Sequence, residues 1–207
     1  MTKITALKAQ LKDQGRVSVF LEGKFAFGLE AETVYKFGLK IGKEYTENEI
    51  SGWLKESEHQ FTFDKVSRFV GLRPRSEKEV RDWFKRKEVP EGLQVLLMEK
   101  LKRLQLIDDR AFVKWWIEQR QTFKPRGSRL LTQELQVKGV DRKLIEQELA
   151  EVPQETGAIK ELAVKKLKTL KRFPKIIQRK KLTDYLLRKG FNYSQIKSAV
   201  DELEEKA

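Results

Sequence analysis

The feature that most constrains the fold is an internal repeat with a period of 51 residues. The stretch "KPRGSRLLTQELQVKGV" at residues 124–140 repeats much of the pattern of "RPRSEKEVRDWFKRKEV" at residues 73–89. Both contain a Pro-Arg pair, two apolar residues four positions apart and a basic residue near the end. In a third copy Ile176 and Ile177 stand in place of the Pro-Arg pair. Such a period is typical of similar units stacked along an axis.

Each copy predicts an amphipathic helix with a defined end. Apolar residues at i and i+4 line one face of a helix. The recurring positions are Val80, Leu131 and Leu182, then Phe84, Leu135 and Leu186, then Lys87, Lys138 and Lys189, and finally Val89, Val140 and Phe191. Gly139 and Gly190 predict left-handed helix stops, whereas Glu88 holds that place in the first copy. Another helix follows each stop: "PEGLQVLLMEKL", "DRKLIEQEL" and "YSQIKSAVDEL". Asp141 is the expected N-cap of the second of these helices, and Ser194 or Asn192 that of the third.

Residues 1–60 predict a small strand and helix unit instead. "ITALKAQ" and "RVSVFLE" alternate like strands, and residues 22–24 predict the turn of a hairpin leading into "FAFGLE". A short helix then stops at Gly38. Thr46 and Glu49 have the spacing of a capping box at the start of the next helix. The only histidine, His59, is placed in a linker before the repeats.

The fold class predicted from these patterns is mainly all-α. We expect an elongated, curved array of three tandem three-helix repeats that follows a small N-terminal β-hairpin and helix unit. The predicted boundaries are residues 1–60 for that unit and residues 61–107, 108–152 and 153–207 for the three repeats. Because one three-helix unit is too small to bury its apolar face, neighbouring units are expected to cover it. The chain is therefore expected to be monomeric.

Charge is the next constraint, because the net charge of +13 is unevenly distributed. Residues 1–60 are neutral, and residues 165–189 contain eleven basic residues with one acidic residue, Asp184. A concentrated positive field attracts polyanions. It favours a nucleic acid or another anionic partner over the alternative of a merely solubilising surface, which would mix both signs.

Several classes of chemistry are disfavoured by composition. The chain has no cysteine, no apolar run long enough to cross a bilayer and no signal-peptide core, which predicts a cytoplasmic protein without a membrane partner. One histidine supports neither a metal site nor a catalytic triad, so no cofactor, metal or catalytic residue is expected. Asp108 and Asp109 could suggest a metal-dependent nuclease, but helix capping is the favoured interpretation. Trp115 and Trp116 are expected in the core, with a role as partner anchors as the alternative.

The stretch "KPRGSRL" is not a phosphate-binding loop, because it has one glycine and follows a helix. Gly127 or Ser128 is expected in the N-terminal cap region of the next helix, whose free N–H groups could meet an acidic side chain or a phosphate. Arg75 and Arg126 occupy equivalent places in two repeats. They are either repeated contact residues or partners in salt bridges with neighbouring helices.

At three of these motifs the chain resembles the RecX family of bacterial recombination regulators. The motifs are "RPRSEKEVRDWF", "LIDDRAFVKWWIEQR" and "PRGSRLLTQELQVKGV", which occur in the family's order over residues 72–150. The resemblance implies three tandem three-helix repeats and a role in DNA repair and the SOS response, without enzymatic activity. It implies binding to the RecA–DNA filament, within its helical groove, and inhibition of the RecA ATPase, strand-exchange and coprotease activities. Glu88 and the unusually basic third repeat depart from the family pattern.

The predicted partners are therefore the RecA filament and single- and double-stranded DNA, bound without sequence specificity through phosphates. The alternative function is a sequence-nonspecific DNA-binding protein that acts mainly by phosphate contacts. Little aromatic interleaving accompanies the basic stripe of the third repeat, which disfavours a base-stacking platform there. The candidate contact residues are Arg73, Arg75, Arg120, Lys124, Arg126, Arg129, Lys138, Lys171, Arg172, Lys175, Arg179, Lys180 and Lys181.

Overall fold

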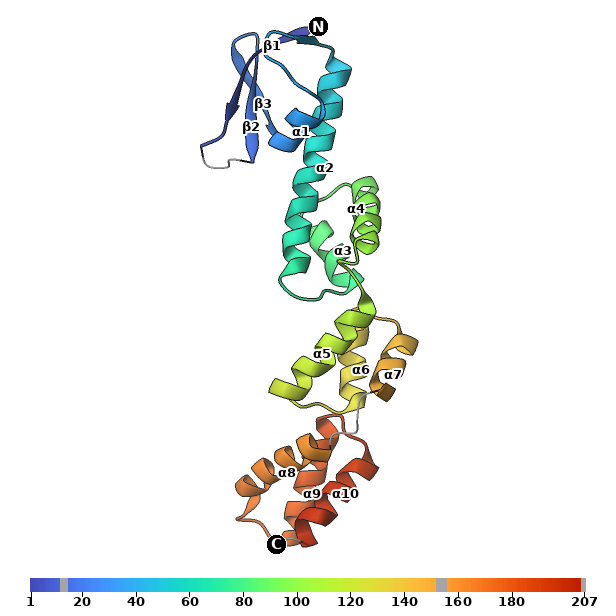
Figure 1. Cartoon of the computed structure of the whole chain (residues 1–207). Helices are drawn as coiled ribbons and strands as arrows, with labels where there is room; N and C mark the ends of the chain where they lie inside the picture. The colour runs from blue at the N-terminus through green and yellow to red at the C-terminus, as the bar shows by residue number, and fades with distance from the viewer. Residues whose placement is uncertain (12–14, 152–155, 206–207) are drawn as a thin grey trace. The chain divides into compact units, whose positions relative to one another are not determined.

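The computed structural model describes residues 1–11, 15–151 and 156–205, and within these ranges it is mainly helical (Figure 1). The chain divides into two compact units. One contains residues 1–72 and 87–100, and the other contains residues 73–86 and 101–207. The predicted class, tandem three-helix repeats after a small strand unit, is confirmed.

The first unit begins with a four-stranded antiparallel sheet in the order β3-β2-β1-β4. Its strands are β1 (Thr2–Ala9), β2 (Arg16–Leu21), β3 (Lys24–Glu30) and β4 (Glu44–Tyr45). The predicted hairpin joins β2 to β3, and its turn places Glu22 and Gly23 at positive φ angles of 48° and 78°. Alternation sends Val19 and Leu29 into the core of this unit, where both are fully buried.

Two helices complete the strand unit. Helix α1 (Ala31–Lys36) is followed by Gly38 at φ 58°, as the sequence predicts. Helix α2 (Glu47–Gly71) begins with the predicted capping box between Thr46 and Glu49. The placement of His59 in a linker is wrong, because α2 continues through residue 59 without interruption and ends only at Gly71. The capping box marks the start of α2 as predicted, but the sequence pattern did not predict that this helix continues to Gly71.

The remaining helices follow the predicted series. They are α3 (Glu77–Arg86), α4 (Glu91–Arg103), α5 (Asp109–Phe123), α6 (Ser128–Val137), α7 (Arg142–Glu151), α8 (Thr156–Leu170), α9 (Lys175–Arg188) and α10 (Tyr193–Glu205). The recurring apolar positions on α3, α6 and α9 are all buried, with at most 3% of each residue exposed: Val80, Phe84, Leu131, Leu135, Leu182 and Leu186. The amphipathic face read from the 51-residue period is confirmed.

The predicted helix stops are confirmed at Gly139 and Gly190, which have φ angles of 81° and 88°. Glu88, the residue at the same place in the first repeat, adopts the same conformation with φ 53°. A left-handed backbone costs a residue with a side chain roughly 1–2 kcal/mol more than it costs glycine. The first repeat therefore has the same left-handed turn after its helix as the other two repeats, although it has no glycine there.

The second and third repeats each enclose a core of their own, so the prediction that a three-helix unit needs its neighbours to cover its apolar face is wrong for these two. Phe112, Ile117 and Ile145 are buried in the core of α5, α6 and α7, and Trp115 and Trp116 pack at its edge. The core of α8, α9 and α10 includes the buried residues Ala163 and Ile196. N-caps form at Asp108 and Asp141, as predicted, and at Asn192, the alternative to Ser194. Their carboxylate or amide oxygens accept backbone N–H groups of the following turn. Ser194 lies inside α10 and is not its N-cap.

Candidate cationic interaction surfaces

The thirteen predicted contact residues fall into two classes by exposure. Eight are exposed to solvent: Lys124, Arg129, Lys171, Arg172, Lys175, Arg179, Lys180 and Lys181. Five are half-buried and lie together where α3, α5 and α6 meet: Arg73, Arg75, Arg120, Arg126 and Lys138. We refer to these five cations, with the side chains of Glu79, Glu134, Trp115 and Trp116 that they contact, as the cation–tryptophan cluster.

Glu79 of α3 is one of the two anions of this cluster. Arg73 binds its carboxylate with two hydrogen bonds, of 2.9 and 3.1 Å, and the Lys138 ammonium binds it at 2.7 Å. The Arg75 guanidinium lies 3.9 Å away. Burial alone would raise the pKa of Glu79, but the hydrogen bonds from Arg73 and Lys138 outweigh it, and the pKa is lowered. Burial, together with the neighbouring Arg73, lowers the pKa of Arg75.

Glu134 of α6 is the second anion. Its Oε2 accepts hydrogen bonds from Arg120 Nε at 2.7 Å and from the indole N–H of Trp116 at 3.0 Å. Arg126 Nε lies 3.1 Å from its Oε1. The salt-bridge alternative for Arg75 and Arg126 is therefore observed, since both approach a carboxylate of their own repeat.

The two tryptophans supply the aromatic half of the cluster. The guanidinium of Arg73 lies 5.1 Å from the centre of the Trp115 ring, and that of Arg120 lies 4.5 Å from the Trp116 ring. The Lys138 ammonium also faces Trp116, at 5.4 Å. Cations held over indole rings are stabilised by the ring quadrupole. The cluster links the first two repeats, because Lys138 of the second repeat binds Glu79 of the first.

The same junction recurs between the second and third repeats. The Ser76 hydroxyl donates to the carbonyl of Lys138 at 2.7 Å, and 51 positions later the Gly127 N–H donates to the carbonyl of Lys189 at 2.9 Å. The Arg129 N–H also donates to Gly190, at 3.3 Å. Gly127 is the N-cap of α6, as expected, but two of the N–H groups proposed for an anion are occupied by carbonyl groups of the next repeat.

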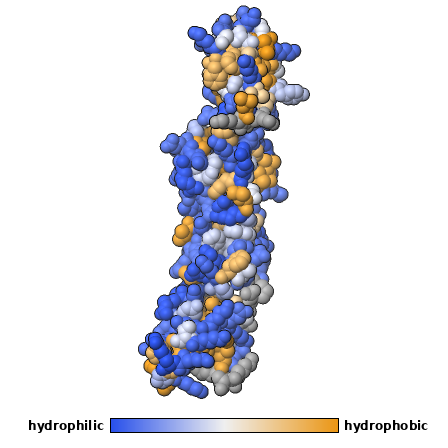
Figure 2. All heavy atoms as spheres, turned by 90° about the vertical axis from the view of Figure 1, so that its left-hand side faces the viewer, coloured by the Kyte–Doolittle hydropathy of each residue, from blue (hydrophilic) through white to orange (hydrophobic). Residues whose placement is uncertain are grey.

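The exposed cations of the third repeat form a separate surface around α9. At the foot of Figure 2, where α8, α9 and α10 lie, hydrophilic side chains cover most of the visible face. Arg172 and Lys181 both lie over the ring of Phe173, at 5.0 and 4.9 Å from its centre. Arg179 binds Asp201 of α10 at 2.6 Å. The sequence indicated this surface through its density of lysine and arginine.

Sequence reasoning missed the anions that hold the cluster. Glu79 lies four residues after Arg75, a spacing that could have indicated an i,i+4 pair on a helix. Glu134 gives no comparable signal, since its partner Arg120 precedes it by fourteen residues and lies on another helix. Glu148 was also missed. It is 2% exposed and lies within 3.5 Å of the charged groups of Arg110 and Lys114.

The paired aspartates serve helix ends. Asp108 caps α5, and Asp109 accepts the Glu77 N–H at 2.9 Å, at the start of α3. Burial raises the pKa of Asp109 above its ordinary value and outweighs the opposing effect of that hydrogen bond. Among the described residues there is no group of three or more His, Cys, Asp or Glu side chains placed to hold a metal ion. Within the same ranges no helix combines the length and hydrophobicity that a membrane crossing requires.

Three segments of the chain match known domain families. Residues 2–46 match the regulatory protein RecX N-terminal domain. Residues 108–149 match the second three-helix domain of RecX, and residues 154–200 match its third three-helix domain. The strand unit and the last two repeats therefore each have a counterpart in one family.

Whole-chain relatives give the same family. Regulatory protein RecX of Bacillus licheniformis is 31% identical over 98% of this chain and 78% of its own length. Regulatory protein RecX of Bacillus pumilus is 32% identical over the same shares of the two chains. A crystal structure of regulatory protein RecX superposes with a TM-score of 0.76 at 25% identity, covering 97% of this chain and all of the other. The chain belongs to the RecX family of regulatory proteins.

Proposed function

We propose that this protein regulates RecA by binding the RecA–DNA filament and inhibiting its ATPase, strand-exchange and coprotease activities. The observation that carries the proposal is the recurrence of one junction between repeats, at Ser76 with Lys138 and at Gly127 with Lys189, in a chain of the RecX family. A chain of similar units presents similar surfaces at intervals, which suits a target that itself repeats along an axis. The helical groove of a filament is such a target.

The exposed cations are the proposed contacts with RecA and with DNA phosphates. The eight exposed candidates can approach a partner without breaking the core, although one of them, Arg179, also pairs with Asp201. The five cations of the cluster, in contrast, already bind Glu79 and Glu134. The cluster still contains five cations for two carboxylates, so it adds positive potential to the surface. In this proposal the protein acts as a monomer, and it inhibits RecA by binding to the filament and not by catalysing a reaction.

Binding to filament and to bare DNA tests the proposal. Fluorescence anisotropy of a labelled oligo-dT, with and without RecA and a slowly hydrolysed ATP analogue, is measured at a salt concentration where the protein alone barely binds. We expect much tighter binding to the filament. Charge reversal of Lys171 and Arg172 to Glu should weaken it, while reversal of Lys24 and Lys55, two exposed lysines of the first unit, should not. Equal affinity for filament and bare DNA would contradict the proposal.

Sequence-nonspecific DNA binding is the second candidate, favoured by the eleven basic residues and single acidic residue of residues 165–189. Binding dominated by phosphates falls steeply with salt, with a log–log slope of about −0.7 per neutralised phosphate on single strands. If the affinity for bare DNA and the affinity for filament fall together with salt, DNA binding alone accounts for the charge.

A further inference from the structure

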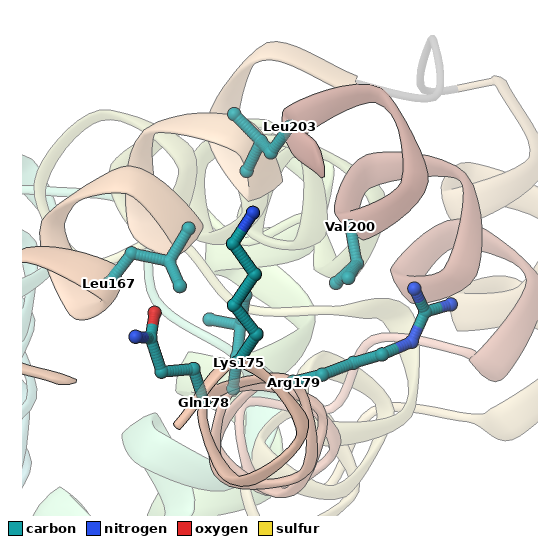
Figure 3. A pocket seen from close by; sticks show the side chains of 7 residues that line it. Leu167, Lys175, Gln178, Arg179, Val200 and Leu203 are labelled. Atoms are coloured by element: carbon teal, nitrogen blue, oxygen red, sulfur yellow. The ribbon is translucent and has the colours of Figure 1, made fainter. Parts of the chain in front are cut away.

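A hollow of about 100 Å³ lies in the third repeat, between α8, α9 and α10 (Figure 3). Four of its lining residues are apolar: Leu167, Leu182, Val200 and Leu203. An enclosed apolar cavity of about 150 Å³ is large enough to bind benzene. The hollow therefore has room for one aliphatic side chain from another molecule.

Polar side chains of α9 border the same hollow. Lys175, Gln178 and Arg179 line it, and Figure 3 shows Lys175 reaching from α9 toward Leu203. The Arg179 guanidinium is held at the α10 side by Asp201, at 2.6 Å. Lys175 is exposed, and it makes no ion pair with any described side chain. A lysine thus lies across an apolar opening with its charge available to an incoming anion.

We propose that this hollow binds an acidic protein segment, taking one aliphatic side chain into the apolar space while Lys175 pairs with a neighbouring carboxylate. Charge complementarity favours an acidic partner, because residues 165–189 carry eleven basic residues and one acidic residue. The apolar walls favour a protein over a nucleic acid. A phosphate backbone would use the cations but would leave the leucines without a partner.

The geometry also divides the basic stripe into two surfaces. Lys175 and Arg179 border the hollow, whereas Arg172 and Lys181 flank the Phe173 ring and do not line it. We assign the hollow to a protein partner and the Phe173 surface to phosphates. This assignment deepens the proposed function and rests on it only for the identity of the partner, which would be a protein of the filament.

Two labelled peptides test the binding directly, without RecA. Each is a decapeptide of Asp and Glu with one central residue, which is Leu in the first peptide and Ala in the second. Fluorescence anisotropy is measured at about 150 mM salt, where long-range attraction between exposed charges is largely screened. We expect the Leu peptide to bind at least fivefold more tightly than the Ala peptide. Equal affinities would overturn the inference, because binding would then depend on charge alone.

Two matched variants locate the site. Lys175→Glu and Lys181→Glu make the same charge change at exposed positions of α9, but only Lys175 lines the hollow, whereas Lys181 lies over the Phe173 ring. We expect Lys175→Glu to weaken the Leu peptide at least tenfold and Lys181→Glu to change it less than twofold. For oligo-dT the expected order is reversed. Equal losses of peptide binding in both variants, or a larger loss of oligo-dT binding in Lys175→Glu than in Lys181→Glu, would overturn the assignment.

The outcome for the proposed function is separate. If neither peptide binds but the protein still binds the filament selectively, the hollow is not a protein site and filament regulation stands. If the Leu peptide binds through Lys175 but the filament is not bound, the peptide site stands and the partner is not RecA.

Discussion

Gly127 and Gly190 bring the backbones of the second and third repeats into direct contact. A Cβ atom added to Gly127 would lie 2.2 Å from the carbonyl carbon and oxygen of Gly190, far inside van der Waals contact. The same closeness lets the Gly127 N–H donate to Lys189 at 2.9 Å. The junction is thus specified by the absence of side chains on both sides.

Substitution of Gly127 by Ala should destabilise the protein for steric reasons alone. Gly127 has φ −75°, a conformation that alanine adopts without strain. Forcing a methyl group into a packed contact costs about 1–3 kcal/mol of unfolding free energy. Urea unfolding measures the loss. Gly157→Ala is the control, because a Cβ there meets nothing within 4 Å, and a urea midpoint lowered equally by both variants would contradict the steric account.

Glu79→Gln should cost about 3 kcal/mol of unfolding free energy at pH 7, because it leaves three cations around an uncharged group. The pKa of Glu79 is lowered in the fold, so its contribution is complete above its unfolded pKa of about 4.3 and is lost as the pH falls through the folded pKa. Wild type and variant should therefore converge toward pH 3. Urea unfolding at both pH values checks this, with the exposed Glu118→Gln as control. A difference that does not shrink at low pH would contradict it.

Asp109→Asn should change the free energy of unfolding in the opposite direction from Glu79→Gln. Burial raises the pKa of Asp109, so its charged form destabilises the fold above that raised pKa, and the penalty disappears as the pH falls below the unfolded pKa. Asparagine keeps an oxygen for the Glu77 N–H, so stability at pH 7 should be unchanged or greater. Asp109→Ala removes the acceptor and should cost about 1 kcal/mol. Thermal unfolding at pH 7 compares them, and equal losses in both variants would show that the charge itself is needed.

Lys180→Gln combined with Lys181→Gln should reduce the salt dependence of single-stranded DNA binding. Each lost phosphate contact lowers the log–log slope by about 0.7 on single strands, so a change of about 1.4 is expected. Lys24→Gln with Lys55→Gln removes the same charge from the first unit and should leave the slope unchanged. Equal changes in both double variants would mean that net charge, and not this surface, governs binding.

Local sequence signals predicted much of the fold. The i,i+4 apolar pairs, the glycines at 139 and 190 and the N-caps at Asp108, Asp141 and Asn192 act within one or two helical turns, so their residue types reveal them. The left-handed conformation of Glu88 was not predicted, because glutamate is not a residue type that indicates a positive φ angle. The length of α2 was not predicted, because a capping box marks where a helix starts but does not indicate where it ends.

The candidate surfaces were harder to predict, because they depend on contacts between distant residues. Lys138 and Glu79 are 59 positions apart, and no pattern in either segment pairs them. The sequence identified the cations but could not separate those that bind carboxylates from those exposed to solvent. The hollow beside Lys175 likewise needs side chains from three helices to be brought together.

The central claim, recognition of the RecA filament, is tested most directly by the single-strand-dependent ATPase of RecA. The protein is titrated well below one copy per RecA, at a salt concentration where it barely binds DNA by itself. The account predicts inhibition at these low ratios, because each bound copy acts on filament and not on free DNA. Inhibition that begins only when enough protein is present to coat the DNA would contradict it and would leave competition for phosphates as the mechanism.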